Sequence, residues 1–158
     1  MDNPIFPGSA LFDLIRGLLR EKNSVRYTAR GFSMAPFIKD GDVLTIVPFN
    51  GSRPKRGDVV AFTPGKGVKL IIHRVIGRKG EEYLIKGDSL AEVDGLFPEE
   101  DLLGKVEKVE RRGKDVILGL GPEKIFLALL NQGRLLIPLL RGMHQWMGPL
   151  LKRKRTET

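Results

Sequence analysis

Short β-branched segments, separated by Gly, Pro and Asp residues, fill the middle of this chain of 158 residues. Such segments are typical of β-strands, and the residues between them favour turns. They are "VLTIV" at 43–47, "DVVAF" at 58–62, "VKLIIHRVI" at 68–76, "EYLIK" at 82–86, "LLGKVEKVE" at 102–110 and "DVILGL" at 115–120. Closely spaced strands with turns between them predict a mostly β core, and the length is that of one ordinary domain.

Helical patterns flank the β region on both sides. Apolar residues recur on one helical face and predict a short amphipathic helix over 9–21: Leu11, Phe12, Ile15, Leu18 and Leu19. After Gly121-Pro122 the sequence is rich in Leu, contains Pro138 and Pro149, and ends in a basic run. We therefore divide the chain into an N-terminal amphipathic helix (1–25), a β domain (26–121) and a C-terminal amphipathic helical tail with a basic end (122–158).

The composition excludes several kinds of chemistry. The chain has no Cys and only two His residues, His73 and His144. Disulfides, a thiolate nucleophile and Cys-ligated metals are excluded, and we expect no metal and no cofactor. The net charge is +8, but the basic residues are scattered and aromatic residues are few, so we expect no nucleic-acid partner.

Three stretches of the β region follow one another in a distinctive order. They are "GFSMAPFIKDGDVLTIVP" at 31–48, "RGDVVAF" with "IIHRVIG" at 56–77, and "YLIKGDSLAEVDG" at 83–95. Together they resemble, over residues 28–110, the signal peptidase I family of serine endopeptidases, a relative of the repressor peptidases in the S24/S26 superfamily. The resemblance implies a signal peptidase-like or repressor-peptidase-like β core that cleaves a precursor, signal or leader peptide.

The resemblance also implies roles for individual residues. Ser33 matches the nucleophile of the family. Bacterial members have a Lys directly before Arg-Val, whereas archaeal and endoplasmic-reticulum members have a His, so His73 of "HRV" matches the general base. Asp94 matches the acidic residue of the His-type members. Asp88 of "KGD" is either a second acidic group near the His or the Asp of a turn.

Elementary chemistry supports the same three main residues. A Ser hydroxyl is a weak nucleophile near neutral pH unless an adjacent base accepts its proton, and a neutral imidazole is suited to this task. A carboxylate on the far ring nitrogen then fixes the tautomer and stabilises the imidazolium. Taken alone, His73 among apolar neighbours is typical of a core histidine; in family order with Ser33 and Asp94 it indicates catalysis.

Two positions depart from the family pattern. Gly31 stands where typical signal peptidases have a Ser whose hydroxyl helps to bind the oxyanion, so the oxyanion site would rest on backbone N–H groups, chiefly that of Ser33. The sequence "GDSLAEVD" also lacks the Asn pair that usually follows Gly-Asp in His-type members, which bears on substrate positioning.

The sequence raises two expectations about location. Residues 1–22 contain neither a secretory signal nor a membrane span, so we expect a protein that faces the cytoplasm. In the tail, Arg134, Arg141, Gln145 and Lys152 form a narrow polar stripe on an otherwise apolar helix. Such a helix suits peripheral contact with a membrane, or a hairpin packed on the β core or on a second subunit, and the oligomeric state stays open.

Two alternative functions remain open. One is a self-processing repressor-type peptidase, although such enzymes usually carry a DNA-binding helix-turn-helix, and 25 residues before the β domain are too few for it. The other is a non-catalytic peptide-binding or membrane-binding module on the same fold. A module of that kind would be expected to have lost Ser33 or His73, and the sequence retains both.

Overall fold

The computed structural model of the chain describes residues 8–65, 69–133, 135 and 137–139. Its elements are α1 (Gly8–Arg20), β1 (Val25–Thr28), β2 (Val43–Val47), β3 (Val59–Phe62), β4 (Ile71–Lys79), β5 (Glu82–Lys86), β6 (Gly95–Pro98), a 3₁₀ turn η1 (Glu99–Asp101), β7 (Leu102–Arg111), β8 (Lys114–Asp115) and α2 (Lys124–Gln132). The predicted fold class is therefore confirmed: a mostly β core with one short helix before the strands and one after them.

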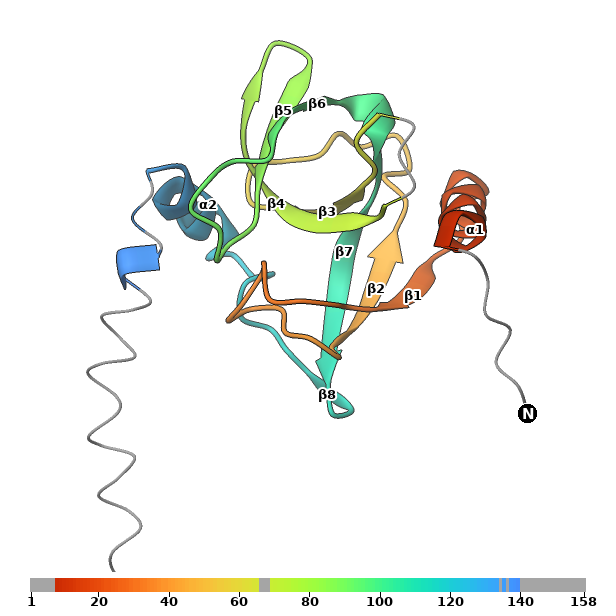
Figure 1. The fold of residues 1–158 in the computed structure, drawn as a ribbon, viewed down its shortest axis with the longest axis horizontal. Coiled ribbons are helices and arrows are strands. Elements are labelled where there is room, and N and C mark those ends of the chain that lie inside the picture. The colour runs from red at the N-terminus through yellow and green to blue at the C-terminus, as the bar shows by residue number, and fades with distance from the viewer. Residues whose placement is uncertain (1–7, 66–68, 134, 136, 140–158) are drawn as a thin grey trace, which may run out of the picture.

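One antiparallel sheet contains all the described strands. They lie in the order β1-β2-β7-β3-β4-β5-β6, and β8 pairs with β7. Strand β7 is long enough to serve two neighbours in succession, because its first part pairs with β3 and the remainder pairs with β2. In Figure 1 this strand runs through the middle of the molecule and joins β1 and β2 to the curled sheet formed by β3 to β6.

The central strand β3 is covered on both faces. Val59 and Ala61 belong to the larger hydrophobic cluster, whereas Val60 and Phe62 belong to a second cluster. Consecutive side chains of a strand point to opposite faces, so burial of both sets requires apolar residues at every position. This explains why "VVAF" is a continuous apolar run rather than an alternating one.

Helix α1 packs on the larger cluster through a narrower face than the sequence predicts. Ile15 and Leu19 are buried, and Phe12 and Leu18 are partly buried against the same cluster. Leu11 is 38% exposed although it was assigned to the same face. Figure 1 shows α1 and α2 on opposite sides of the sheet, so the two helices pack against different parts of the core.

Helix α2 docks on the β core, contacting mainly β4. Leu127, Ala128 and Asn131 are buried, and Lys124 forms an ion pair with Asp58 at 2.6 Å. A Cβ atom on Gly57 would lie 2.8 Å from the Lys124 carbonyl group, so this close approach requires glycine. The first part of the predicted tail therefore packs on the core, whereas Arg134 and residues 140–158, which together contain the whole polar stripe, lie outside the described part of the chain.

The turn before α2 is held by a carboxylate. Glu123 accepts hydrogen bonds from the backbone N–H groups of Gly119 and Gly121, at 2.6 and 3.2 Å. These bonds, chiefly the one from Gly119, lower the pKa of Glu123. No helix in the described ranges is long and apolar enough to cross a membrane.

Some of the observed strand boundaries agree with those predicted from the sequence, and others do not. The strands expected at 43–47 and 82–86 have those bounds, whereas the one expected at 68–76 begins at Ile71. The strand expected at 115–120 is wrong beyond Asp115, because Ile117 and Leu118 are 77% and 63% exposed. Two short strands, β1 and β6, were not predicted.

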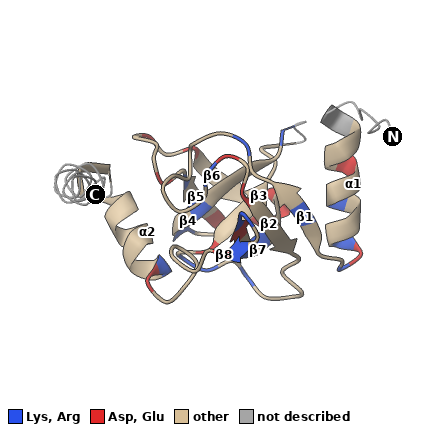
Figure 2. Ribbon diagram, turned by 90° about the horizontal axis from the view of Figure 1, so that it is seen from below, with Lys and Arg blue, Asp and Glu red and all other residues tan. Residues whose placement is uncertain are grey.

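Charged residues of both signs alternate along the described ribbon in the view of Figure 2. Several of them pair across strands, such as Arg26 with Glu110 at 3.1 Å and Lys108 with Asp115 at 3.0 Å. The excess of positive charge is therefore interleaved with acidic groups in the sheet. The expectation of no nucleic-acid partner stays a prediction.

Candidate active site

Ser33, His73 and Asp94 form a continuous chain of hydrogen bonds. The distance from His73 Nε2 to Ser33 Oγ is 2.8 Å, and the distance from His73 Nδ1 to Asp94 Oδ2 is 2.6 Å. With the ring proton on Nδ1, the imidazole donates to the Asp94 carboxylate, and Nε2 accepts the proton of the Ser33 hydroxyl. The three residues that the sequence groups together are thus in direct contact.

Different parts of the sheet position these three side chains. His73 lies in β4, where it pairs with Val60 of β3, and it is only 6% exposed. Asp94 directly precedes β6, and its backbone N–H donates to the carbonyl of Ile85 in β5 at 2.9 Å. Ser33 lies in the turn that follows β1. The site therefore depends on the tertiary structure of the whole sheet.

Residues 31–34, which we call the serine turn, are held by the segment after β5. The backbone N–H of Ser89 donates to the Ser33 carbonyl at 2.9 Å, and the Ser89 hydroxyl donates to the Phe32 carbonyl at 2.6 Å. A Cβ atom on Gly87 would lie 2.8 Å from the Ser33 carbonyl oxygen. Glycine at 87 thus permits the two segments to approach closely enough for these bonds.

The other side of the serine turn is held by Asp40. Its carboxylate accepts the backbone N–H of Gly31 at 2.8 Å, and Gly31 has a φ of +86°, which favours glycine. The backbone N–H of Ser33, in contrast, has no acceptor among the residues that the structure describes. This donor is the one on which the sequence analysis places the oxyanion site of a chain that lacks a Ser at 31, and that role stays a prediction.

A cavity of about 350 Å³ opens beside the three residues. Polar and apolar surface contribute about equally to its lining, which includes two cationic side chains: Tyr27, Ala29, Arg30, Gly31, Ser33, Met34, Ile38, Lys69, Leu70, Ile71, Ile72, His73, Leu90 and Asp94. Cavities of this size that combine apolar walls with a few polar groups are typical of ligand sites.

Asp88 lies in a separate, buried cluster. Both of its carboxylate oxygens accept hydrogen bonds from Arg74, at 2.8 and 2.7 Å, and both side chains are 0% exposed. Asn131 of α2 also donates to Asp88, at 3.1 Å. The structure therefore does not bring Asp88 into the Ser33–His73–Asp94 chain. Of the two roles the sequence allowed, Asp88 has that of a turn residue, because it lies in the turn after β5, and its carboxylate binds Arg74.

Arg74 ties this cluster to two loops. Its Nη1 donates to the backbone carbonyls of Gly57 and Gly119, both at 2.8 Å. Every polar contact of the guanidinium lies inside the protein, where an ion pair needs such additional hydrogen bonds to offset the cost of desolvation. Arg74 thus links β4, the loop before β3 and the segment that leads into α2.

Sequence reasoning missed three residues that hold the site together: Arg74, Ser89 and Asn131. Arg74 lies within the "HRV" motif, and Ser89 follows "KGD", so proximity to motif residues was the available signal for both. For Asn131 the signal was a single amide within the apolar run "KIFLALLN". In the described ranges, His, Asp and Glu residues form no cluster suited to a metal ion.

The hydrogen bonds among Ser33, His73 and Asp94 give an arrangement in which an imidazole can accept the proton of a serine hydroxyl. A family model described as signal peptidase, peptidase S26, matches residues 9–121. The chain belongs to this family, and the family is one of peptidases. A search of curated proteins finds no match to this sequence.

Proposed function

We propose that the protein is a serine endopeptidase that cleaves a precursor, signal or leader peptide. The observation that carries the proposal is the pair of hydrogen bonds, 2.8 and 2.6 Å long, that joins Ser33, His73 and Asp94. In the proposed reaction, Ser33 Oγ attacks the scissile carbonyl while His73 Nε2 accepts its proton. His73 then gives that proton to the leaving amine, and a water molecule hydrolyses the acyl-enzyme by the same route.

Two further groups complete the proposed mechanism. Asp94 holds the proton on Nδ1 of His73 and stabilises the imidazolium that forms during attack. The backbone N–H of Ser33 stabilises the negative charge that develops on the carbonyl oxygen. The hydrogen bonds from Ser89 keep the serine turn in place, so this donor is positioned before substrate binds.

Free strand edges on both sides of the cavity support a peptide as substrate. Strand β1 pairs with β2 on one side, and its other edge has no strand among the described residues. Ile71 and Ile72 pair with β3, whereas the pairing of β4 with β5 begins only at Arg74. An extended peptide between these edges would find backbone partners on both sides, which is a common way to bind peptides.

The experiment is a comparison of wild-type protein with Ser33→Ala on a synthetic peptide library, read by mass spectrometry. We expect wild-type protein to cleave a subset of peptides, and Ser33→Ala to leave all of them intact at an unchanged unfolding midpoint. Ser52→Ala is a matched control, because Ser52 lies in an exposed turn and does not line the cavity. Cleavage by folded Ser33→Ala protein at the wild-type rate would contradict the proposal.

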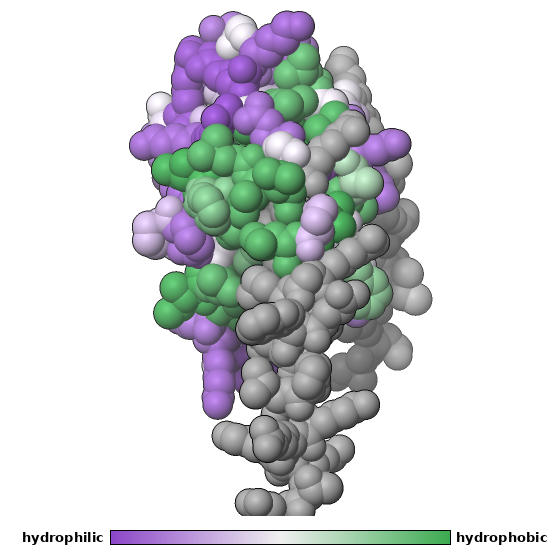
Figure 3. Space-filling model, turned by 90° about the vertical axis from the view of Figure 1, so that its left-hand side faces the viewer, coloured by the Kyte–Doolittle hydropathy of each residue, from purple (hydrophilic) through white to green (hydrophobic). Residues whose placement is uncertain are grey.

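We also propose peripheral contact with a membrane through α2 and the tail. Figure 3 shows apolar side chains gathered on the side of the molecule where α2 lies, and Ile125, Phe126 and Leu129 of α2 are 52%, 60% and 47% exposed. The basic residues 152–155 would add attraction to anionic lipid of about 1 kcal/mol per charge near the surface.

Sedimentation with phosphatidylglycerol vesicles tests this contact, with phosphatidylcholine vesicles as the control for charge. Deletion should begin at residue 140, because a cut at or before residue 131 would remove Asn131 and expose Asp88. We expect the full chain to sediment with anionic vesicles and the shortened chain to bind less. A full chain that ignores both kinds of vesicle would contradict the membrane proposal and leave the peptidase proposal intact.

A further inference from the structure

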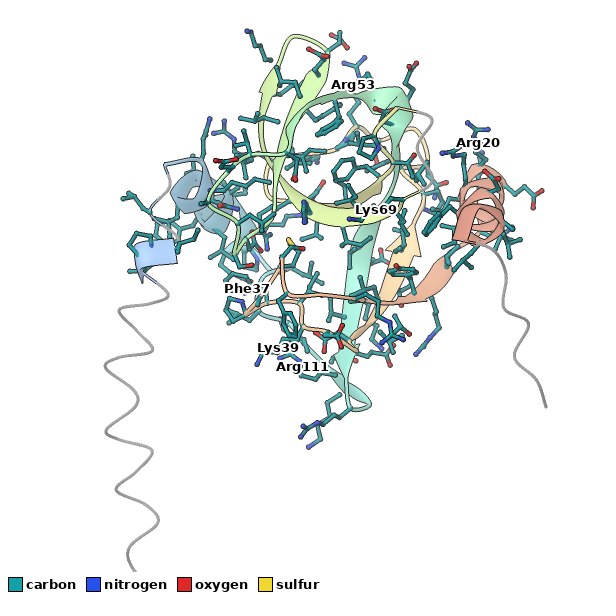
Figure 4. The ribbon with its side chains drawn as sticks, viewed as in Figure 1. Arg20, Phe37, Lys39, Arg53, Lys69 and Arg111 are labelled. Atoms are coloured by element: carbon teal, nitrogen blue, oxygen red, sulfur yellow. The ribbon has the colours of Figure 1, made fainter. Side chains whose placement is uncertain are left out.

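Two cations line the candidate active site, and neither forms an ion pair with another residue in the described part of the chain. Arg30 follows β1 and Lys69 precedes β4, so they lie on the two segments that flank the cavity. Both side chains are exposed. Figure 4 shows Lys69 at the start of β4, on the side of that strand where the chain after β1 runs.

The charge around the cavity is unbalanced among the described residues. Asp94 is the one carboxylate in the lining, and its Oδ2 is hydrogen-bonded to His73. Neither Arg30 nor Lys69 forms an ion pair with a described residue, whereas other cations do, such as Arg111 with Asp42 and Lys124 with Asp58. Arg30 and Lys69 therefore line the same cavity as Ser33 and His73, whereas Lys79, which also forms no ion pair with a described residue, does not line it.

We propose that Arg30 and Lys69 select a substrate with an acidic side chain close to the bond that is cut. This inference rests on the proposed peptidase function and specifies its substrate class. A peptide that occupies the cavity passes between the segments that carry these cations, so a Glu or Asp side chain on it meets positive charge. A Lys or Arg side chain at the same place meets like charge.

The expected size of this preference for acidic side chains follows from the solvent exposure of Arg30 and Lys69. A single solvent-exposed ion pair is worth a factor of roughly 1.4 to 5, and like charges in the same place are unfavourable by a similar amount. With two cations, exchanging Glu for Lys at the best position should change kcat/KM about 10-fold. The effect should shrink as salt is added, since exposed charges are screened.

The test uses a peptide that wild-type protein cleaves and a positional set in which Glu, Gln or Lys replaces each residue near the cut. We expect kcat/KM in the order Glu, Gln, Lys at one or more positions. The double variant Arg30→Glu/Lys69→Glu should reverse this order. Lys79→Glu is the matched control, because Lys79 is exposed at the end of β4 and does not line the cavity.

Cleavage of the Glu and Lys peptides at rates within twofold of each other at every position would overturn the inference. So would a Lys79→Glu variant that shifts the preference as strongly as the cavity variant. Either result leaves the peptidase proposal intact, because cleavage itself is observed.

A binding measurement separates the two proposals when no peptide is cleaved. Fluorescence anisotropy with Ser33→Ala protein should show tighter binding of labelled Glu peptides than of Lys peptides, and adding the Arg30→Glu/Lys69→Glu changes should reverse this difference. Equal binding of both, or binding of neither, would overturn the inference. Absence of cleavage together with charge-selective binding would contradict the peptidase proposal alone.

Discussion

His73 and Arg74 are neighbours in β4, and each pairs with an aspartate from the segment between β5 and β6, yet the two pairs differ in their surroundings. The side chain of Asp94, beside His73, is 20% exposed and lines the cavity, whereas the side chain of Asp88, beside Arg74, is 0% exposed. Consecutive side chains of a strand point to opposite faces, so β4 presents one residue to the cavity and the next to the interior.

This difference in exposure and partner indicates which of the two carboxylates is able to take part in a reaction. Asp94 contacts an imidazole, which can gain and lose a proton, at the edge of a cavity that a substrate can enter. Asp88 is bound on both oxygens by a guanidinium, which stays protonated, and is sealed under α2. The first pair fits a reacting site, and the second fits a framework that joins α2 to the sheet.

The largest expected effect comes from the residue on the cavity side. His73→Gln keeps a polar side chain in place but removes the base, so we expect kcat to fall by about 10⁴-fold or more. Steady-state kinetics on a cleaved peptide measure this loss. Thermal unfolding shows that the variant is folded at the assay temperature, and a folded His73→Gln protein that keeps near wild-type kcat would contradict the catalytic assignment.

Arg74→Met should act on stability instead. The change leaves the Asp88 charge buried without its guanidinium, and breaking such a pair costs roughly 3–5 kcal/mol. Urea unfolding should show this loss in the free energy of unfolding. A loss below about 1 kcal/mol would indicate that water reaches Asp88, and the contrast between the two faces of β4 would then be wrong.

A smaller effect on kcat is expected from Ser89, which holds the serine turn but does not touch the reacting groups. Ser89→Ala removes the hydroxyl that donates to the Phe32 carbonyl, and we expect kcat to fall about 3- to 10-fold with little change in KM. Ser52→Ala removes a similar exposed hydrogen bond, from Ser52 to the Phe49 carbonyl, and should leave kcat unchanged. Equal kinetics for the two variants would show that the serine turn does not depend on Ser89.

The smallest effect concerns Asp42, a carboxylate of the framework. Burial alone would raise the pKa of Asp42, but hydrogen bonds from Arg111 and from the Lys39 backbone outweigh it and lower the pKa from 3.8. The ionised form therefore stabilises the fold above about pH 4, and this contribution is lost as the pH falls through the lowered value. Asp42→Asn should reduce the loss of stability in acid, as measured by thermal unfolding between pH 2 and pH 6; an unchanged acid profile would contradict this role.

Much of the fold followed from local patterns. The β-branched segments predicted a mostly β core because strand residues and turn residues alternate clearly along the chain. The segment 115–120 failed because its apolar composition says nothing about what covers it, and Ile117 and Leu118 remain exposed in the structure. Strands β1 and β6 were missed because they lack the continuous apolar run of the equally short β3, and have the sequences "VRYT" and "GLFP" instead.

The candidate site was predictable in part. The order of Ser33, His73 and Asp94 matched a known family, and the structure brings these three side chains into contact. The buried position of Asp88 beside Arg74 was not predictable, because the sequence "KGD" does not specify on which side of the sheet the Asp side chain lies. Asn131 depends on how α2 docks, and that is a property of the tertiary structure.

The most direct test of the account is the paired comparison of Asp94→Asn with Asp88→Asn, with kcat and the unfolding midpoint measured on the same samples. We predict that Asp94→Asn lowers kcat by roughly 10²- to 10⁴-fold and leaves the midpoint nearly unchanged. Asp88→Asn should lower the midpoint by about 10 °C and, below that temperature, retain most of the wild-type kcat. The opposite pattern, in which Asp88→Asn loses activity while folded and Asp94→Asn stays active, would contradict the assignment of Asp94 to the reaction and of Asp88 to the framework.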